Sequence, residues 1–203
     1  IIGRLVGSEM CIRDRNHAGH KRHIYFQKYS KNNNLNTTLV TSNRSYINGE
    51  KITFSNIKNI IIFNCFFKNV GIFNKVMSYF EFSLQAYLKL NFSNYDVVIA
   101  SSPNLLTAFF MLLKAKARRK KFIFEIRDIW PESLVYLSGL KRGGFVYTIL
   151  KKIERYLITQ SNGVVSTVHN FEAYLEKEKL QCKNYLHTVS YTHLTLPTST
   201  HGV

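Results

Sequence analysis

The sequence predicts an α/β protein built around a mostly parallel β-sheet. Short apolar runs of strand length alternate with longer segments whose apolar residues recur at helical spacing, which is the pattern of repeated βαβ units. The length of 203 residues suits one such domain or a piece of a larger protein. The 15 Phe and 12 Tyr residues supply enough apolar bulk for a core and argue against disorder.

The first half of the chain contains the weaker signals. Basic and aromatic residues at 20–30 recur at roughly helical spacing, and the polar residues at 31–34 end this pattern. Residues 35–40 predict a strand, and the apolar run at 60–63 predicts a short buried strand of a parallel sheet. Residues 43–58, which separate the two strands, are polar and predict a loop or a weak hairpin.

The second half alternates more clearly. Strands are expected at residues 96–100, 121–126, 164–168 and 184–188. Helices are expected at 73–90, 105–118, 171–179 and around the stripe Val146, Ile149, Leu150, Ile153 and Leu157. In the first of these helices, the apolar positions at helical spacing are Val76, Met77, Phe80, Leu84, Tyr87 and Leu88. Ser102 is a candidate N-cap with Pro103 in the first turn, and Pro131 is placed to open another short helix.

Charge and cysteine content limit the function classes. The formal net charge is +16 and the pI is near 9.8, which first suggests nucleic acid or an anionic membrane as a partner. Cys11, Cys65 and Cys182 form neither a disulfide framework nor a CxxC pair, which disfavours a secreted mini-domain and a structural zinc site. His17 and His20 have no Cys or carboxylate beside them, so no metal site is predicted. No apolar stretch reaches the ~18 residues that a membrane span needs.

Both ends of the chain resemble translated sequencing adapters. Residues 5–14, LVGSEMCIRD, match one reading frame of a transposon-end adapter, and residues 189–198, VSYTHLTLPT, match the partner adapter in reverse complement. We therefore interpret residues 1–15 and 189–203 as scars of library preparation, and we expect the natural protein to be truncated at both ends. The two ends together contribute one net positive charge, so residues 16–188 keep +15 of the +16.

Polar side chains follow three of the expected strands where the strands end. They are Ser101 and Ser102, Arg127 and Asp128, and Ser166 and Thr167. Ligands of open α/β sheets bind beyond the carboxyl ends of the strands, so these residues are expected to line one rim. There, Arg127 could bind a phosphate or carboxylate with two hydrogen bonds, and Asp128 could bind a sugar hydroxyl or receive its proton. Ser102 at a helix N-terminus would add backbone N–H groups for an anion.

The same residues also have structural interpretations. Ser102 can act as a helix cap alone, and Asp128 can cap the short helix that follows it. Arg127 can form a structural pair with Glu125 or Glu132. The spacing of the residues leaves these alternatives open, and it predicts no more than an α/β domain with a polar rim at the strand ends.

Three segments carry a more specific pattern. They are YDVVIASSP at 95–103, FIFEIRDIWPES at 122–133, and IERY at 153–156 followed by NGVVST at 162–167. Together they resemble the N-terminal half of a glycosyltransferase of family 4, and RDIWPES is the most specific piece. The nearest subgroup is that of bacterial surface-polysaccharide enzymes similar to the N-acetyl-fucosamine transferases. The resemblance covers roughly residues 16–188 and indicates no particular substrate.

This resemblance implies one half of a GT-B architecture, in which two Rossmann-like domains face each other across a cleft. Each domain has a mostly parallel sheet with helices on both faces, and no metal is obligatory. The N-terminal domain of such enzymes binds the acceptor, and the C-terminal domain binds the nucleotide-sugar donor. In this chain the first strand, most of the Gly-rich loop and the C-terminal domain are expected to be missing, and Ala18-Gly19-His20 looks like the remnant of that loop. The fragment is therefore expected to be inactive alone.

The resemblance also implies roles for individual residues. Asp128 is the candidate catalytic residue, which orients an acceptor hydroxyl or supports developing charge. It is not expected to be a nucleophile, because retaining enzymes of this type are expected to react by front-side displacement. The acceptor-binding candidates are Gly19, His20, Ser101, Ser102, Arg127 and Glu132. No cofactor is expected, since the nucleotide-sugar donor binds mainly to the missing domain.

The function implied for the intact protein is that of a hexosyltransferase of surface-polysaccharide (O-antigen) biosynthesis, which moves a sugar from a nucleotide sugar to a lipid-linked or polysaccharide acceptor. The dense basic run of Lys114, Lys116 and residues 118–121 suits peripheral binding to the cytoplasmic face of the cell membrane, or merely a solvated helix end. Two alternatives stay open. A nucleic-acid-binding module suits the charge but lacks the usual motifs. A non-catalytic phosphate- or sugar-nucleotide-binding domain suits the α/β pattern but lacks a GxGxxG turn.

Overall fold

The structure is a computed structural model that describes residues 4–8, 22–44, 50–51, 59–68, 72–102 and 104–188. Within these residues, the expected strands and helices form with bounds within two residues of the predicted ones. The strands are β1 Arg4–Ser8, β2 Asn36–Ser42, β3 Ile60–Phe63, β4 Val97–Ser101, β5 Lys121–Ile126, β6 Gly163–Ser166 and β7 Tyr185–His187. The helices are α1 Arg22–Asn32, α2 Ile72–Lys89, α3 Leu105–Ala117, α4 Glu132–Ser138, α5 Phe145–Gln160 and α6 Phe171–Lys177, with a 3₁₀ turn at Phe92–Asn94.

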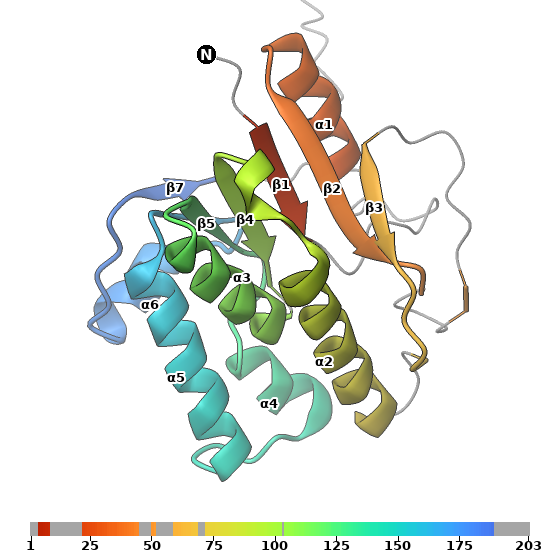
Figure 1. Ribbon diagram of the computed structural model, residues 1–203. Helices are drawn as coiled ribbons and strands as arrows, with labels where there is room; N and C mark the ends of the chain where they lie inside the picture. Colours follow the sequence, from red (N-terminus) through yellow and green to blue (C-terminus); the bar gives the residue numbers. More distant parts are fainter. Residues whose placement is uncertain are drawn as a thin grey trace, which may run out of the picture.

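The seven strands of the described residues belong to one parallel sheet of order β3-β2-β1-β4-β5-β6-β7. The chain moves outward from β1 to β3, returns to the other side of β1, and then moves outward again from β4 to β7 (Figure 1). This order defines a doubly wound, Rossmann-like sheet, in which ligands bind near the carboxyl ends of the strands at the reversal between β1 and β4. The predicted fold class is confirmed.

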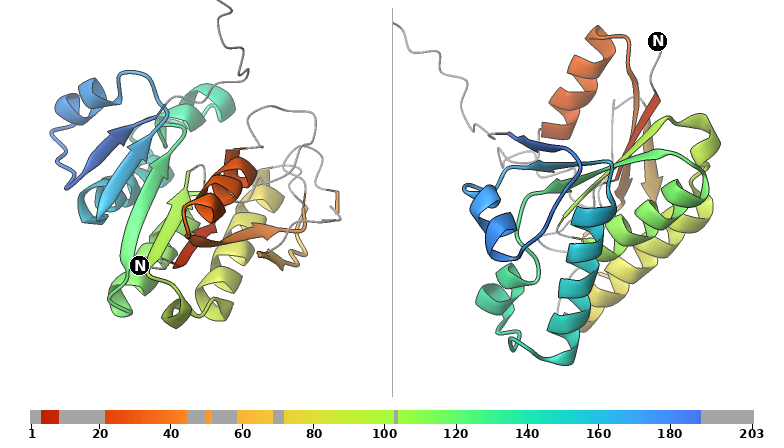
Figure 2. Two further views of the ribbon diagram at one scale, coloured as in Figure 1. Left: turned by 90° about the horizontal axis from the view of Figure 1, so that it is seen from above. Right: turned by 90° about the vertical axis from the view of Figure 1, so that its left-hand side faces the viewer.

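Helices cover both faces of the sheet. The layer formed by α2, α3 and α5 lies on one face, and α1 lies on the other (Figures 1 and 2). A helix that joins two parallel strands runs back along the sheet, so α2, α3 and α5 begin near the carboxyl edge of the sheet and end near its amino edge. The short helix α4 follows β5 and lies beyond the carboxyl edge (Figure 1). The sheet thereby presents one edge, with α4 beside it, for a ligand site.

The main core lies between the sheet and the layer of α2, α3 and α5. Helix α3 buries a stripe with helical spacing, which consists of Ala108, Met111, Leu112 and Ala115. The facing side chains of β5 include Phe122 and Phe124, which are at most 1% exposed. Leu157 and Ile158 of α5 complete the same cluster. Burial of these large side chains is the dominant favourable term for this part of the fold.

Helix α2 is apolar on two sides. Its inward side is formed by Phe82, Ala86 and the small residues Ser78 and Ser83, all at most 1% exposed. The small side chains let α2 approach α3, where the hydroxyls of Ser83 and Thr107 share a hydrogen bond of 2.7 Å. The apolar stripe found in the sequence at Val76, Phe80, Leu84, Tyr87 and Leu88 instead faces outward and is exposed. The core contacts of α2 therefore leave this stripe outside the core and largely exposed.

The structure corrects the sequence-based prediction for the first strand. The sheet was expected to lack its first strand, but Arg4–Ser8 forms β1 and pairs with β2 on one side and β4 on the other. Without a strand at this position, both β2 and β4 would present a row of unpaired backbone groups, which any short extended segment can satisfy. The strand lies within the residues that resemble an adapter. Strand formation does not bear on their origin, which stays a prediction.

Candidate functional site

The three polar strand ends predicted from the sequence lie side by side. In the parallel register, Ser101 of β4 is opposite Glu125 of β5, and Ile126 of β5 is opposite Ser166 of β6. The backbone N–H of Thr167 donates to the carbonyl of Ile126 at 3.0 Å, which extends the pairing beyond the last strand residues. Residues 101–102, 125–128 and 166–167 thus form one continuous rim at the carboxyl edge of the sheet, which we call the strand-end rim.

Ser102 fixes the backbone of the strand-end rim. Its hydroxyl oxygen accepts hydrogen bonds from the N–H groups of Arg127 at 2.9 Å and Asp128 at 3.3 Å, and its hydroxyl donates to the carbonyl of Asp128 at 3.4 Å. Ser102 is fully buried. The predicted role of Ser102 as a helix cap is wrong, because α3 begins at Leu105 and its cap is Asn104, whose side chain accepts from Thr107 N at 3.1 Å. Ser102 holds the turn that carries Arg127 and Asp128.

Ser101 contacts a buried carboxylate. Its hydroxyl donates to Oε2 of Glu125, and both residues are at most 6% exposed. A carboxylate taken out of water is costly unless it accepts hydrogen bonds, so this contact stabilises Glu125 inside the sheet edge. From the sequence, Glu125 was predicted only as a possible partner of Arg127. The signal that could have found it is the Glu within the otherwise apolar strand KFIFEI.

Arg127 and Asp128 are the charged groups of the strand-end rim. Arg127 is half-buried, and burial lowers the pKa of its guanidinium, while the neighbouring Asp128 carboxylate opposes this effect. Asp128 is exposed. The alternative that Asp128 caps the next helix is wrong, because α4 begins at Glu132 with Pro131 as its cap residue and no side-chain cap. The pair therefore offers a fixed cation and an accessible carboxylate on one rigid turn.

Glu132 points to another part of the molecule. Its carboxylate accepts from Tyr147 Oη at 2.5 Å and from Arg142 Nη2 at 3.0 Å, and it lies 4.0 Å from Lys151 Nζ. Burial alone would raise the pKa of Glu132, but the hydrogen bonds from Tyr147 and Arg142 outweigh burial and lower it. The bond to Glu132 raises the pKa of Tyr147 to about 12. The role of Glu132 in acceptor binding stays a prediction. The contacts of Glu132 in the structure join α4 to α5.

A second ionic cluster joins α5 to α6. Lys151 Nζ lies 3.3 Å from Glu154 and 3.4 Å from Glu178, and it donates to Tyr174 Oη at 2.6 Å. Tyr174 in turn donates to Glu154 Oε2 at 2.7 Å. Glu154 is buried, which raises its pKa to about 7 despite these partners, and its Oε1 has no hydrogen-bond partner among the described residues. This cluster fixes the helices behind the strand-end rim.

The remaining predictions concern residues outside this rim. Gly19 and His20 lie outside the described residues. No group of three or more His, Cys, Asp or Glu gathers as a metal site in the described part of the chain. Cys65 is buried, and burial raises the pKa of its thiol to about 12, which makes it a poor nucleophile. None of the helices described is both long and apolar enough to cross a membrane.

Comparison with known proteins finds similarity to solved structures. The chain is similar to the crystal structure of UGT89C1, a UDP-glycosyltransferase of GT-B fold from Arabidopsis thaliana, complexed with UDP. The TM-score is 0.54 at 13% identity, and the similarity covers 93% of this chain and 52% of the other. This chain therefore spans about half the length of that structure. No protein-family model and no curated protein matches the sequence. The similarity shows that the chain has the Rossmann-like fold of a GT-B half.

Proposed function

We propose that this chain is the acceptor-side half of a retaining glycosyltransferase of family 4. The observation that carries the proposal is the strand-end rim, where Ser102 fixes Arg127 and the exposed carboxylate of Asp128 at the ligand-binding edge of a Rossmann-like sheet. The fold shared with a UDP-glycosyltransferase supports it, as does the resemblance carried by RDIWPES. The intact enzyme would move a hexose from a nucleotide sugar to a lipid-linked or polysaccharide acceptor in surface-polysaccharide synthesis.

The proposed chemistry assigns separate tasks to the two charged residues. In the transfer, an acceptor hydroxyl oxygen forms a bond to the anomeric carbon of the donor while the bond from that carbon to the leaving phosphate breaks. Asp128 orients the acceptor hydroxyl and supports the charge that develops on the sugar. Arg127 binds a phosphate or carboxylate of the acceptor. The hydroxyl proton passes to the leaving phosphate oxygen, so Asp128 forms no covalent intermediate.

The proposed location is the cytoplasmic face of the cell membrane, with the protein bound peripherally. A lipid-linked acceptor resides there, and a net charge of +16 favours an anionic surface. We also propose that residues 1–15 and 189–203 derive from sequencing adapters and that 16–188 is the domain. Long-read resequencing of the source DNA tests this point, and an open reading frame with these same ends would contradict it.

The test of the catalytic proposal uses the uninterrupted gene. Asp128→Asn should lower kcat for sugar transfer by about 10²-fold or more and leave the fold unchanged, as judged by circular dichroism. Asp96→Asn is the matched control, because Asp96 is an exposed aspartate immediately before β4, at the opposite edge of the sheet. Its turnover should stay within about twofold of the wild type. Unchanged turnover of Asp128→Asn would refute the role of Asp128.

A further inference from the structure

We propose that the outer face of the α2-α3-α5 layer binds an anionic lipid bilayer. This inference rests on the proposed function, which places the protein at the membrane, and it identifies the surface that would meet the membrane. Three features of the layer carry it. Apolar side chains are exposed on the outer sides of α2 and α5, aromatic rings connect the three helices, and the charges on this face are positive.

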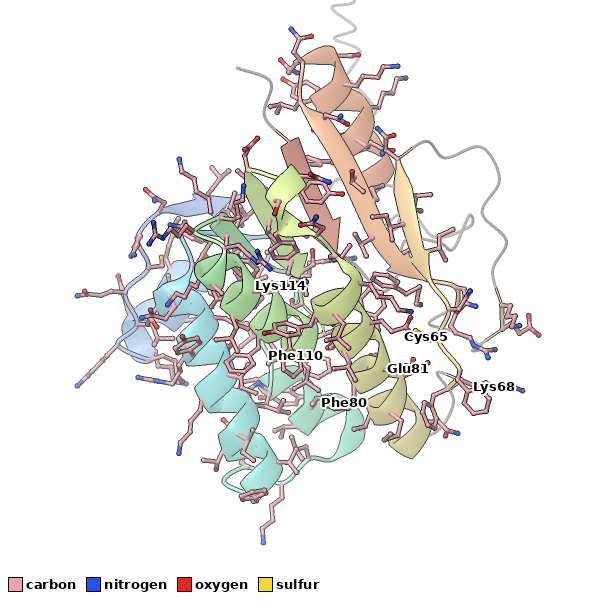
Figure 3. All side chains as sticks on the ribbon, viewed as in Figure 1. Cys65, Lys68, Phe80, Glu81, Phe110 and Lys114 are labelled. Carbon is pink, nitrogen blue, oxygen red and sulfur yellow. The ribbon has the colours of Figure 1, made fainter. Side chains whose placement is uncertain are left out.

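The exposed apolar side chains form stripes and not isolated positions. On α2, Phe80, Leu84 and Leu88 recur every four residues and are 45%, 40% and 67% exposed. On α5, Phe145 and Ile149 are 81% and 41% exposed. Figure 3 shows Phe80 and Phe110 on the outer side of the layer, whereas Glu81 lies on the flank of α2 next to β3. Contiguous apolar surface of this kind marks a contact with another molecule or a membrane.

A chain of aromatic rings makes the face continuous across the three helices. The ring of Tyr87 on α2 lies 5.8 Å from that of Phe110 on α3, and Phe110 lies 6.0 Å from Phe109. Phe109 in turn lies 5.8 Å from Tyr156 on α5. Tyrosine combines an apolar ring with a polar hydroxyl and suits the boundary between acyl chains and headgroups.

Lysines are interleaved with these rings. Lys114 Nζ lies 5.4 Å from the ring centre of Tyr87 and donates to the backbone carbonyls of Tyr87 and Leu90 at the end of α2. Lys116 Nζ lies 5.2 Å from the ring centre of Tyr156 and donates to Gln160 Oε1 at 2.5 Å. Lys152 is exposed and falls between Ile149 and Tyr156 on the same side of α5. Lys114 and Lys116 therefore place positive charge along the aromatic rings, and an exposed lysine such as Lys152 can lie along apolar surface and extend its charge to a membrane interface.

The acidic residues of these helices point elsewhere. The sequence of α3 contains none, and α2 and α5 contain one each, Glu81 and Glu154. The carboxylate of Glu81 accepts from the backbone N–H groups of Phe66 and Phe67, and Glu154 is buried against α6. The outer face therefore combines apolar and basic groups without a carboxylate from its own helices.

This combination favours a bilayer over a second copy of the chain. Two such faces would bring lysines against lysines with no carboxylate between them, so their association is opposed by charge. Anionic headgroups complement the lysines, and the acyl region accepts the apolar stripes. Both α2 and α5 begin at the carboxyl edge of the sheet, so a membrane on this face would border the strand-end rim and its acceptor.

The test measures co-sedimentation of the full chain with vesicles and needs neither donor nor acceptor. Binding is expected to vesicles of phosphatidylglycerol and phosphatidylcholine at low salt, to weaken at high salt, and to be weak with phosphatidylcholine alone. Phe80→Gln/Leu88→Gln should reduce the affinity by about tenfold or more, and Lys152→Gln by about fivefold. The matched controls are Leu186→Gln on β7, where the leucine is 58% exposed, and Lys183→Gln, both of which should bind like the wild type.

Several outcomes would overturn the proposal. Absence of binding to the anionic vesicles at low salt is one, and equal loss in the control variants is another. Sedimentation equilibrium without lipid distinguishes a second copy: a wild-type dimer that Phe80→Gln/Leu88→Gln converts to a monomer would show that this face binds another chain. If the protein encoded by the uninterrupted gene binds vesicles but transfers no sugar, that result would count against the proposed function and not against this surface.

Discussion

The two halves of the sheet differ in how they use buried polar groups. In the half formed by β4 to β7, buried hydroxyls have clear partners: Ser102 binds the backbone of the strand-end rim, and Ser101 binds Glu125. In the half formed by β2 and β3, Thr37 and Thr41 of β2 are buried, and their hydroxyls find no hydrogen-bond partner among the described residues. Unpaired buried hydroxyls lower stability, so buried hydroxyl groups have opposite effects on stability in the two halves.

The apolar core shows the same asymmetry. Phe122, Phe124 and Ile126 of β5 are all at most 2% exposed and belong to the main cluster. From β2 and β3, Val40 and Phe63 also belong to this cluster, whereas Leu39 of β2 is equally buried but lies outside it. The half that carries the strand-end rim is therefore the half with the larger core. A rigid support is what a site needs when it must hold Arg127 and Asp128 in fixed positions.

The largest expected effect comes from removing an aromatic ring of the main cluster. Phe124→Ala should lower the free energy of unfolding by about 3–5 kcal/mol, because it leaves a cavity between the sheet and α3. Leu39→Ala, at a residue that is also 1% exposed, should cost about 2 kcal/mol. Urea denaturation followed by circular dichroism measures both. An equal or greater loss for Leu39→Ala would contradict the asymmetry of the core.

The second effect concerns the buried carboxyl group of Glu154, which lies in the half with the larger core and lowers its stability when it is charged. Its pKa of about 7 lies above the ordinary value of 4.5, so the folded state holds the proton more tightly than the unfolded state. Its contribution to stability is therefore present at low pH and is lost as the pH rises from about 4.5 to 7. Glu154→Gln keeps an acceptor for Tyr174 and removes the charge, and it should raise stability at pH ~8 by about 1–3 kcal/mol.

Unfolding curves recorded across this pH range test the role of Glu154. The advantage of Glu154→Gln over the wild type should disappear as the pH falls below the ordinary pKa of the carboxyl group. Glu172→Gln, at an exposed position in the first turn of α6, is the control and should leave the pH dependence unchanged. If the free energies of unfolding of Glu154→Gln and the wild type differed by the same amount at every pH, the raised pKa of Glu154 would be contradicted.

The third effect compares two fully buried serines at strand ends. Ser102→Ala removes the acceptor of two backbone N–H groups and should cost about 1–2 kcal/mol. Ser42→Ala, at the end of β2, removes a hydroxyl whose two contacts with Arg44 are both 3.3 Å, and it should cost no more than about 0.5 kcal/mol. Thermal unfolding of the two variants side by side measures the difference. Equal losses of stability in the two variants would show that the hydrogen bonds of Ser102 stabilise the strand-end rim no more than those of Ser42 stabilise the end of β2.

The sequence predicted the second half of the molecule better than the first, for a physical reason. Strong apolar runs such as that of β5 and the pairs of polar residues after β4 and β5 are local signals, and the parallel register then places them at one rim. Which atoms bind within the rim depends on tertiary contacts. The bonding of Ser102 to residue 127 and the contacts of Glu132 with α5 have no local signal. The cap of α3 at Asn104 is local, since Asn is a favoured cap residue, but it competes in the sequence with Ser102.

The sequence also could not predict which side of α2 is buried. Its pattern has two apolar stripes, and the more hydrophobic one, with Phe80 and Leu88, was the natural candidate for the core. The side with Ser78 and Ser83 is buried instead, because small residues permit close approach to α3. Periodicity predicts that a helix is amphipathic, but helix packing decides which side is buried.

The smallest expected effect is the most direct comparison of the two halves, since it uses the same substitution in both. Thr41→Val on β2 replaces a buried hydroxyl that lacks a partner among the described residues, and it should raise the free energy of unfolding by up to about 1 kcal/mol. Thr107→Val on α3 removes a hydroxyl bonded to Ser83 at 2.7 Å and should lower it by about 1 kcal/mol. Both threonines are at most 3% exposed, so the change in volume and burial is matched.

The changes in the free energy of unfolding of the two variants are expected to have opposite signs. A loss of stability in Thr41→Val equal to that in Thr107→Val would therefore mean that the hydroxyl of Thr41 is hydrogen-bonded. The two halves would then use their buried polar groups alike.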